Sequence, residues 1–195
     1  MKSPVFGGRI TAPFDEPRPL EGPKTHIHGA LDIAGGDGII KSPCTGEAQG
    51  FVFFRQKDGT WKAQGEKPQI TEWPWRNYWA DIFGAIITIK EHGTGRLHIL
   101  AHTWPAQLGK LLFTRLHYIE SAETGRWPAH GIFTEKALVM RGKAIAMIGN
   151  SGYSTGPHLH WEIHHQADHL DDYAARVNPK EYVEEIGRAS CRERV

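Results

Sequence analysis

The sequence predicts a mainly β protein with only a minor helical component. Most segments of the 195-residue chain are short and either apolar or alternating, with Gly, Pro, Asn or Asp between them. The chain holds 22 Gly and 12 Pro, and 39% of its residues are hydrophobic, so it can bury a core while making many turns. These proportions exclude a coiled coil, a collagen-like rod and a disordered tail.

Six segments have the pattern of strands. Two weaker candidates come first along the chain, residues 30–33 and 46–53, and the turns GGDG and SPCTG separate them. Four clearer candidates follow, because each is continuously apolar or alternating over strand length. They are GAIITIK (84–90), RLHILA (96–101), KAIAMI (143–148) and HLHWEI (158–163).

Helical periodicity is confined to a few short segments. The best candidate is 171–177, with a terminal turn over 178–183, and a further short helix is expected at about 106–116. That last helix lies in an insertion over 104–141. The length suits one domain, which we place over residues 1–186. The last nine residues fit no pattern and indicate a disordered tail or a cloning or read-through scar over 187–195.

An earlier insertion, residues 55–81, is polar but rich in aromatic side chains. A structureless insertion of this length tends to be functional or mobile. We favour a small satellite core for its tryptophans, and an aromatic platform for sugar or peptide is the alternative. Its aromatic residues are Trp61, Trp73, Trp75, Tyr78 and Trp79.

Charge and hydropathy exclude several classes of partner. Lys and Arg number 23 against 22 Asp and Glu, and a net charge of +1 lacks the positive field of a nucleic-acid binder. No stretch approaches the roughly 18 apolar residues that a membrane-spanning helix needs. The first residues, MKSPVFGGRITAPF, have no apolar core of a secretion signal. Cys44 and Cys191 are too few for a disulfide framework, and we interpret both as incidental.

The 12 histidines direct attention to metal and proton chemistry, since imidazole is the commonest metal ligand and titrates near neutral pH. His28 and Asp32 lie four residues apart beside a glycine-rich turn. One imidazole nitrogen and one carboxylate oxygen can bind the same zinc ion at about 2.0 to 2.2 Å. Pairs with this spacing also arise by chance, so the motif alone is weak.

A second motif strengthens the case. His158 and His160 lie in a predicted strand, so their side chains share one face while Leu159 and Trp161 occupy the other. The turn-rich loop over 149–157 precedes them and allows the backbone to deliver the strand into a cleft. The pair can supply two metal ligands, or one ligand and one acid or base. A solvated strand face is the alternative.

Two further sets of residues can be assigned to a strand face by the same alternation. Alternation places His98, Leu100 and His102 on one side of their strand, with His102 at its end. Glu162 shares the face of His160, where it either orients a histidine or lies at a solvated rim. The remaining histidines have no partner in the pattern and are interpreted as surface or hydrogen-bonded core residues.

The segments HGALDIAG, LAHTW and GNSGYSTGPHLHWEI together resemble the lysostaphin/LytM-type zinc metallopeptidases, most of which cut peptide bonds in bacterial peptidoglycan. The resemblance extends over residues 8–163. It implies a compact, mostly antiparallel, sandwich-like β domain with a few short helices, in which long loops line a groove that holds the metal. Some members carry a tyrosine shortly before the first ligand, and residues 18–27 contain none.

Carried over residue by residue, the resemblance makes His28, Asp32 and His160 the ligands of one Zn²⁺ per chain. Three protein ligands are the pattern of a catalytic zinc rather than a structural one. His158 then matches the general base, and His102 matches a second histidine that orients or protonates the reacting groups. Contact with substrate is assigned weakly to Trp73, Trp75, Trp79 and Tyr153.

The expected function is therefore zinc-dependent hydrolysis of a peptide bond in a peptidoglycan cross-link or bridge. The alternative is a non-catalytic module of the same fold that binds the cell wall or activates other hydrolases. We expect a monomer that acts on the wall, whether periplasmic, extracellular or delivered by a phage, with no nucleic acid as partner.

Overall fold

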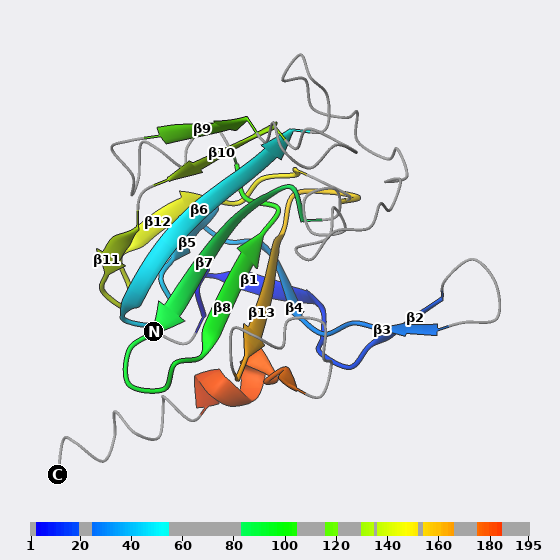
Figure 1. Ribbon diagram of the computed structural model, residues 1–195. Helices are drawn as coiled ribbons and strands as arrows, with labels where there is room; N and C mark the ends of the chain where they lie inside the picture. The colour runs from blue at the N-terminus through cyan, green and yellow to red at the C-terminus, as the bar shows by residue number, and fades with distance from the viewer. Residues whose placement is uncertain are drawn as a thin grey trace, which may run out of the picture.

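One antiparallel sheet dominates the computed structural model, which describes residues 3–19, 25–54, 83–104, 116–120, 130–134, 136–151, 154–165 and 175–184 (Figure 1). Its strands lie in the order β1-β4-β13-β8-β7-β6-β10-β9, and β11 also pairs with β6. The strands of this sheet are β1 (Gly8–Ala12), β4 (Leu31–Gly35), β6 (Gly46–Phe54), β7 (Ala85–Glu91), β8 (Leu97–Ala101), β9 (Leu116–Glu120), β10 (His130–Thr134), β11 (Ala137–Val139) and β13 (Leu159–His164).

Two smaller sheets accompany it. β5 (Ile39–Lys41) pairs with β12 (Ala144–Met147), and β2 (Pro17–Pro19) pairs with β3 (Thr25–Ile27) in a hairpin that projects from the body (Figure 1). A short helix covers residues 179–184. None of the helical segments in the described part of the chain has the length and apolarity needed to cross a membrane. The prediction of a mainly β, antiparallel fold with few helices is confirmed.

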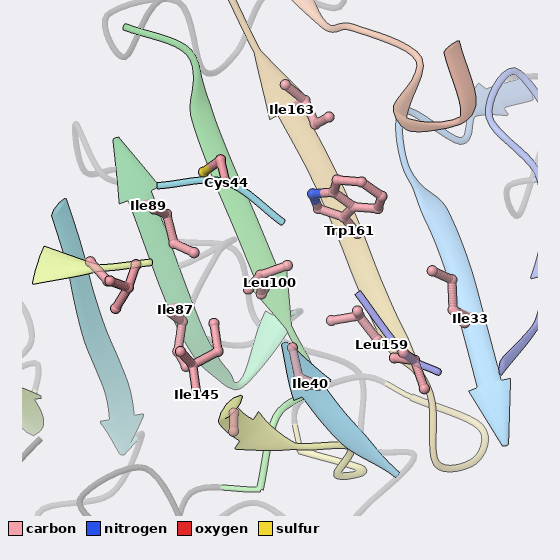
Figure 2. Close-up of a cluster of buried hydrophobic side chains, with 14 of the residues drawn as sticks. Ile33, Ile40, Cys44, Ile87, Ile89, Leu100, Ile145, Leu159, Trp161 and Ile163 are labelled. Carbon is pink, nitrogen blue, oxygen red and sulfur yellow. The ribbon is translucent and has the colours of Figure 1, made fainter. Parts of the chain in front are cut away.

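The core lies between the large sheet and the β5–β12 pair. Leu159, Trp161 and Ile163 project from one face of β13 into a cluster of buried side chains, and Figure 2 shows them beside residues of the neighbouring strands. Ile40 of β5 and Ile145 of β12 belong to the same cluster, and both are fully buried. Each such aliphatic side chain stabilises the fold by about 1.5 to 3 kcal/mol through removal from water.

Replacing Ile87 of β7 with alanine is expected to lower the free energy of unfolding by about 2 to 5 kcal/mol, because the packed core cannot fill the cavity. Ile87 is 0% exposed within the core cluster. The matched control is Ile10→Ala on β1, where the side chain is 51% exposed and the change should stay within about 0.5 kcal/mol. Urea unfolding of both variants measures the difference, and equal effects would contradict the position of the core.

All six predicted strands are present, as β4, β6, β7, β8, β12 and β13. The prediction for the insertion over 104–141 is wrong in part. Strands β9, β10 and β11 lie in this region, where we expected a short helix and loops. Residues 106–115 of that expected helix lie outside the described residues, and Leu116 begins β9. β9 and β10 pair with each other, and β10 pairs with β6, so the partner that stabilises them is distant in sequence.

The helix expected over 171–177 is described only at its end, where Ala175 belongs to a 3₁₀ turn and Arg176 already pairs with β13, so the helix does not extend to residue 177. Residues 175–177 run beside β13, with His165 N donating to Ala175 O at 2.8 Å and Val177 N donating to Ile163 O at 2.8 Å. The helical turn expected over 178–183 is found at 179–184. Asn178 Oδ1 accepts from Lys180 N at 3.0 Å, and a proline follows the asparagine, which is a favoured start of a helix. The tail over 187–195 lies outside the described residues.

The C-terminal helix is fastened to the sheet through Glu91. The Glu91 carboxylate accepts hydrogen bonds from Tyr182 Oη and from Thr94 Oγ1, both at 2.5 Å. Burial alone would raise the pKa of Glu91, but the contacts with His98, Thr94 and Tyr182 outweigh it and lower the pKa to about 2. The ionised carboxylate is therefore the form that the native structure stabilises.

Glu91→Gln should make stability less sensitive to acid. Because the native pKa lies below the unfolded value of 4.5, the carboxylate stabilises the fold above about pH 4.5 and loses this effect as the pH falls toward about 2. The variant should be less stable than wild type at pH 7 by about 1 to 2 kcal/mol, and the gap should narrow toward pH 2.5. Urea unfolding across this range measures the gap, and a constant gap would contradict the assignment.

Candidate metal centre

Two neighbouring strands bring the predicted ligands together. β13 pairs with β4 so that His160 lies opposite Asp32, while Leu159 lies opposite Ile33. Residues paired across antiparallel strands share a face, so Asp32 and His160 lie together on the face away from the core. Leu159 and Ile33 belong to the core cluster on the other side. The predicted division of the two faces of β13 is confirmed.

His28 joins them from the segment before β4. Its backbone N donates to Glu16 O at 2.9 Å, and its O accepts from Asp15 N at 2.9 Å, so two hydrogen bonds hold the segment. Its ring is also held, because Nδ1 lies 3.0 Å from Pro13 O and donates to it. Nε2 is then the nitrogen turned toward Asp32 and His160.

Three ligand atoms form a compact triangle. His28 Nε2 lies 3.2 Å from Asp32 Oδ1 and 3.3 Å from His160 Nδ1, and the last two atoms are 2.9 Å apart. Zinc bonds of about 2.0 to 2.1 Å in a tetrahedron require ligand atoms about 3.3 to 3.4 Å apart, so small movements would accommodate the ion. All three residues are buried. The donor set therefore fits a zinc ion.

The other ring nitrogen of His160, Nε2, also has a partner. His160 Nε2 lies 3.1 Å from Glu162 Oε1, and Glu162 Oε2 lies 2.8 Å from His164 Nε2. A carboxylate beside the outer nitrogen of a histidine fixes the tautomer and makes the inner nitrogen a better ligand. Glu162 is 2% exposed, so the prediction of a role toward a histidine holds and the solvated rim is wrong.

The charges in this cluster depend on one another. Burial would raise the pKa of Asp32, but hydrogen bonds and charge from His160 and His28 dominate and hold the pKa far below its ordinary value. Burial would likewise lower the pKa of His160, yet its contacts with Asp32 and Glu162 raise it to about 9. The centre thus concentrates negative charge next to His160, an environment that favours a cation.

His158 and His102 lie beside the triangle. The two rings are 4.7 Å apart between centroids, and His158 Nε2 lies 3.7 Å from Asp32 Oδ2. His158 Nδ1 donates to Gly156 O at 2.8 Å, and His102 Nδ1 donates to Ser151 O at 2.8 Å. In each neutral ring Nε2 is then a hydrogen-bond acceptor, which is the form required of a proton acceptor.

The prediction that His102 shares a strand face with His98 and Leu100 is wrong. Leu100 is buried in the core cluster and His98 contacts Trp161 on the core side, but His102 lies among the site histidines. The strand ends at Ala101, and His102 has a φ of 58°. This left-handed conformation interrupts the period of two and turns the ring to the opposite side. Burial first, and then the charges of the two neighbouring histidines, lower the pKa of His102 to about 3.

Known peptidases resemble this chain in a sequence segment and in fold. The model of peptidase family M23 matches residues 130–172, which include His158 and His160. A zinc-containing peptidase from Vibrio cholerae is similar, with 17% identity, a TM-score of 0.51 and coverage of 92% of this chain and 38% of that one. The catalytic domain of the antimicrobial peptidase lysostaphin from Staphylococcus simulans is also similar, with 17% identity, a TM-score of 0.50 and coverage of 91% and 92%. No curated protein matches the chain.

The predicted family resemblance is confirmed. The fold is of the M23 type, and the sequence match falls on the strand that carries the HLH motif. The chain spans 38% of the length of the Vibrio protein and most of the lysostaphin catalytic domain.

Several residues of this candidate site were not found from the sequence. The backbone oxygens of Pro13, Ser151 and Gly156 hold three of the histidine rings, and a backbone acceptor leaves no signal in residue types. Phe83 packs on His160 with ring centroids 4.9 Å apart. Its position directly before the GAIITIK strand was the only available signal. The weak substrate candidates Trp73, Trp75, Trp79 and Tyr153 lie outside the described residues.

A second group of possible ligands in the described residues does not suit a metal. Cys44, Glu91 and His98 bring ligand atoms within 4.8 Å of one another. Trp161 Nε1 lies 3.3 Å from His98 Nδ1, and because an indole N–H can only donate, His98 Nδ1 must accept. The proton of the neutral ring is then on Nε2, the nitrogen facing Glu91, and a protonated nitrogen cannot ligate. We interpret this group as part of the hydrogen-bonded core, as predicted for His98.

Proposed function

We propose that the protein is a zinc-dependent endopeptidase that hydrolyses a peptide bond in bacterial peptidoglycan, in a cross-link or an interpeptide bridge. The observation that carries this proposal is the position of two histidine rings, His102 and His158, directly beside a triangle of three zinc-ligand atoms. A structural zinc site has four protein ligands and no need of adjacent proton acceptors. The M23 resemblance and the peptidases named among the similar structures support the same conclusion.

His28 Nε2, Asp32 Oδ1 and His160 Nδ1 would hold the zinc. Bound zinc supplies Lewis acidity, which lowers the pKa of a water and polarises the scissile carbonyl. Each ligating ring is oriented by a hydrogen bond at its other nitrogen. His28 Nδ1 contacts Pro13 O, and His160 Nε2 contacts Glu162. The chain itself thus fixes which nitrogen of each ring faces the ion.

His158 is proposed as the general base. Its Nδ1–H is held by Gly156 O, so Nε2 presents a lone pair next to Asp32 and can take a proton from the attacking water. The same proton is then delivered from Nε2 to the departing amine nitrogen. Such proton transfer is worth about 10²- to 10⁴-fold in rate.

His102 is proposed to orient the reacting water. With its pKa lowered to about 3, the ring is neutral at pH 7 and Nε2 accepts a hydrogen bond. Its Nδ1–H is anchored to Ser151 O, and Ser151 Oγ in turn donates to Thr103 O at 2.9 Å and accepts from Ala85 N at 2.9 Å. These bonds hold His102 in its left-handed conformation beside His158.

The test is mass spectrometry of fragments released from purified peptidoglycans of different cross-link chemistry. The zinc-loaded protein should create new amino termini, whose sequence names the bond, and a chelator should abolish them. As a control, His92→Ala should release the same fragments as the wild type, because the His92 ring is exposed and lies outside the site. Zinc binding without cleavage of any wall type would overturn the proposal and favour the non-catalytic wall-binding module.

A further inference from the structure

A buried charged cluster lies behind His160, on the side away from Asp32. Glu162 Oε1 lies 3.1 Å from His160 Nε2 and 3.5 Å from Arg176 Nη1. Glu162 Oε2 lies 2.8 Å from His164 Nε2. The side chains of Glu162 and Arg176 are 2% and 13% exposed. A carboxylate buried this deeply is costly unless several donors compensate it, and here three surround it.

Arg176 reaches this cluster through an unusual strand contact. β4 pairs with β13 only at Leu159–Trp161, and residues 175–177 take the adjacent place along β13. An isolated bridge joins Arg176 to His164. Because paired residues share a face, Arg176 emerges on the same face as His160, Glu162 and His164. It lies beyond the segment that matches the M23 model, which ends at residue 172.

The path of Arg176 also explains the glycine after His28. A Cβ at Gly29 would lie 1.9 Å from Arg176 Nη1 and 2.6 Å from Arg176 Cδ. The φ of Gly29 is not in the left-handed region, so the constraint at this position is space: a methyl group there would have to displace the Arg176 side chain. The Arg176 side chain therefore packs directly on the backbone next to one ligand while contacting Glu162 behind another.

We propose that Glu162 and Arg176 are positioning residues of the metal centre, which together set the tautomer of His160 and the placement of the His28 segment. An ionised carboxylate can only accept, so the His160 nitrogen beside Glu162 must donate. Nδ1 of His160 also lies beside a carboxylate, 2.9 Å from Asp32 Oδ1, so without metal both ring nitrogens donate. On zinc binding Nδ1 would give up its proton and ligate, while Glu162 keeps the proton on Nε2. Arg176 holds Glu162 from the C-terminal segment and closes over Gly29, so one side chain links both ligand-bearing segments.

This inference rests on the proposed function only in the assumption that His28, Asp32 and His160 hold zinc. The first variant is Glu162→Gln, which keeps the size of the side chain but turns donors toward His164 or Arg176. We expect zinc affinity to fall about 10- to 100-fold, the range usual for partners of this kind. Competition with a chromogenic chelator measures the affinity without any peptide substrate. Lys180→Met is the matched control, because Lys180 is exposed on the same C-terminal segment.

The second experiment is a double-mutant cycle. Gly29→Ala should weaken zinc binding because the new methyl group displaces the Arg176 guanidinium. In an Arg176→Ala background the space is vacated, so Gly29→Ala should cause a much smaller further loss. The four proteins are compared by zinc titration, after circular dichroism with chelator present has shown that each is folded. Equal losses in both backgrounds would overturn the role of Arg176.

A spectroscopic readout separates positioning from a merely structural role. In the zinc-loaded protein, ¹H–¹⁵N spectra of the histidine rings should show His160 protonated at Nε2 and not at Nδ1, and Glu162→Gln should alter that signal selectively. Unchanged zinc affinity in Glu162→Gln, or a proton on His160 Nδ1, would overturn the inference even if the wild type cuts peptidoglycan. Zinc binding with the expected losses but no cleavage would support this inference while the proposed function fails.

Discussion

His160→Ala is expected to abolish zinc binding and peptidase activity together. The substitution removes one of three ligand atoms that lie 2.9 to 3.3 Å apart and leaves only His28 and Asp32. Loss of a residue that hydrogen-bonds a metal-ligating side chain already costs about 10- to 100-fold in metal affinity. Loss of the ligand itself should therefore cost more than about 100-fold. Metal analysis after dialysis and fragment release from peptidoglycan measure the two effects.

The same variant should also lose the stabilisation that zinc gives to the folded chain. A ligand at 100 times its dissociation constant stabilises a protein by about 2.7 kcal/mol, so added zinc should raise the Tm of wild type and leave that of His160→Ala unchanged. His92→Ala, an exposed histidine, should behave as wild type in both experiments. Full zinc occupancy in His160→Ala would show that the ion lies elsewhere.

The second large effect is expected for His158→Ala, which should retain zinc but lose about 10²- to 10⁴-fold in kcat. The His158 ring is not part of the ligand triangle, and its Nε2 lies 3.7 Å from Asp32 Oδ2, the carboxylate oxygen outside the triangle. Removing it leaves the three ligand atoms in place while removing the acceptor of the water's proton. Metal content and turnover of the same sample distinguish the two properties.

His102→Asn provides the comparison for this result. The asparagine keeps polarity near Ser151 but removes the Nε2 acceptor, so kcat should fall with zinc retained. If His158→Ala instead lost its zinc while His102→Asn kept it, His158 would be a ligand and its assignment as the base would be wrong.

Part of the candidate metal centre could be predicted from local sequence, whereas the roles of its residues came from the family resemblance. His28 and Asp32 lie four residues apart. The HLH motif places His160 on one face of its strand and the core residues Leu159 and Trp161 on the other face. The period of a strand is a property of the backbone, so the side of the sheet on which each residue lies can be derived without knowing its partner strand. The extra strands β9, β10 and β11 could not be derived in this way, because their stability depends on pairing with distant segments.

The mainly β class, the core face of β13 and the residue types able to bind a metal can all be predicted from the order of the amino acids. The pairing of His160 with Asp32, the departure of His102 from the alternation of its strand, and the packing of Arg176 on Gly29 are evident only in the folded chain. The difference lies in the range of the interactions. Alternation and turn preference act between neighbours in the chain, whereas strand register, a left-handed residue held by hydrogen bonds and a buried arginine depend on groups brought together by folding.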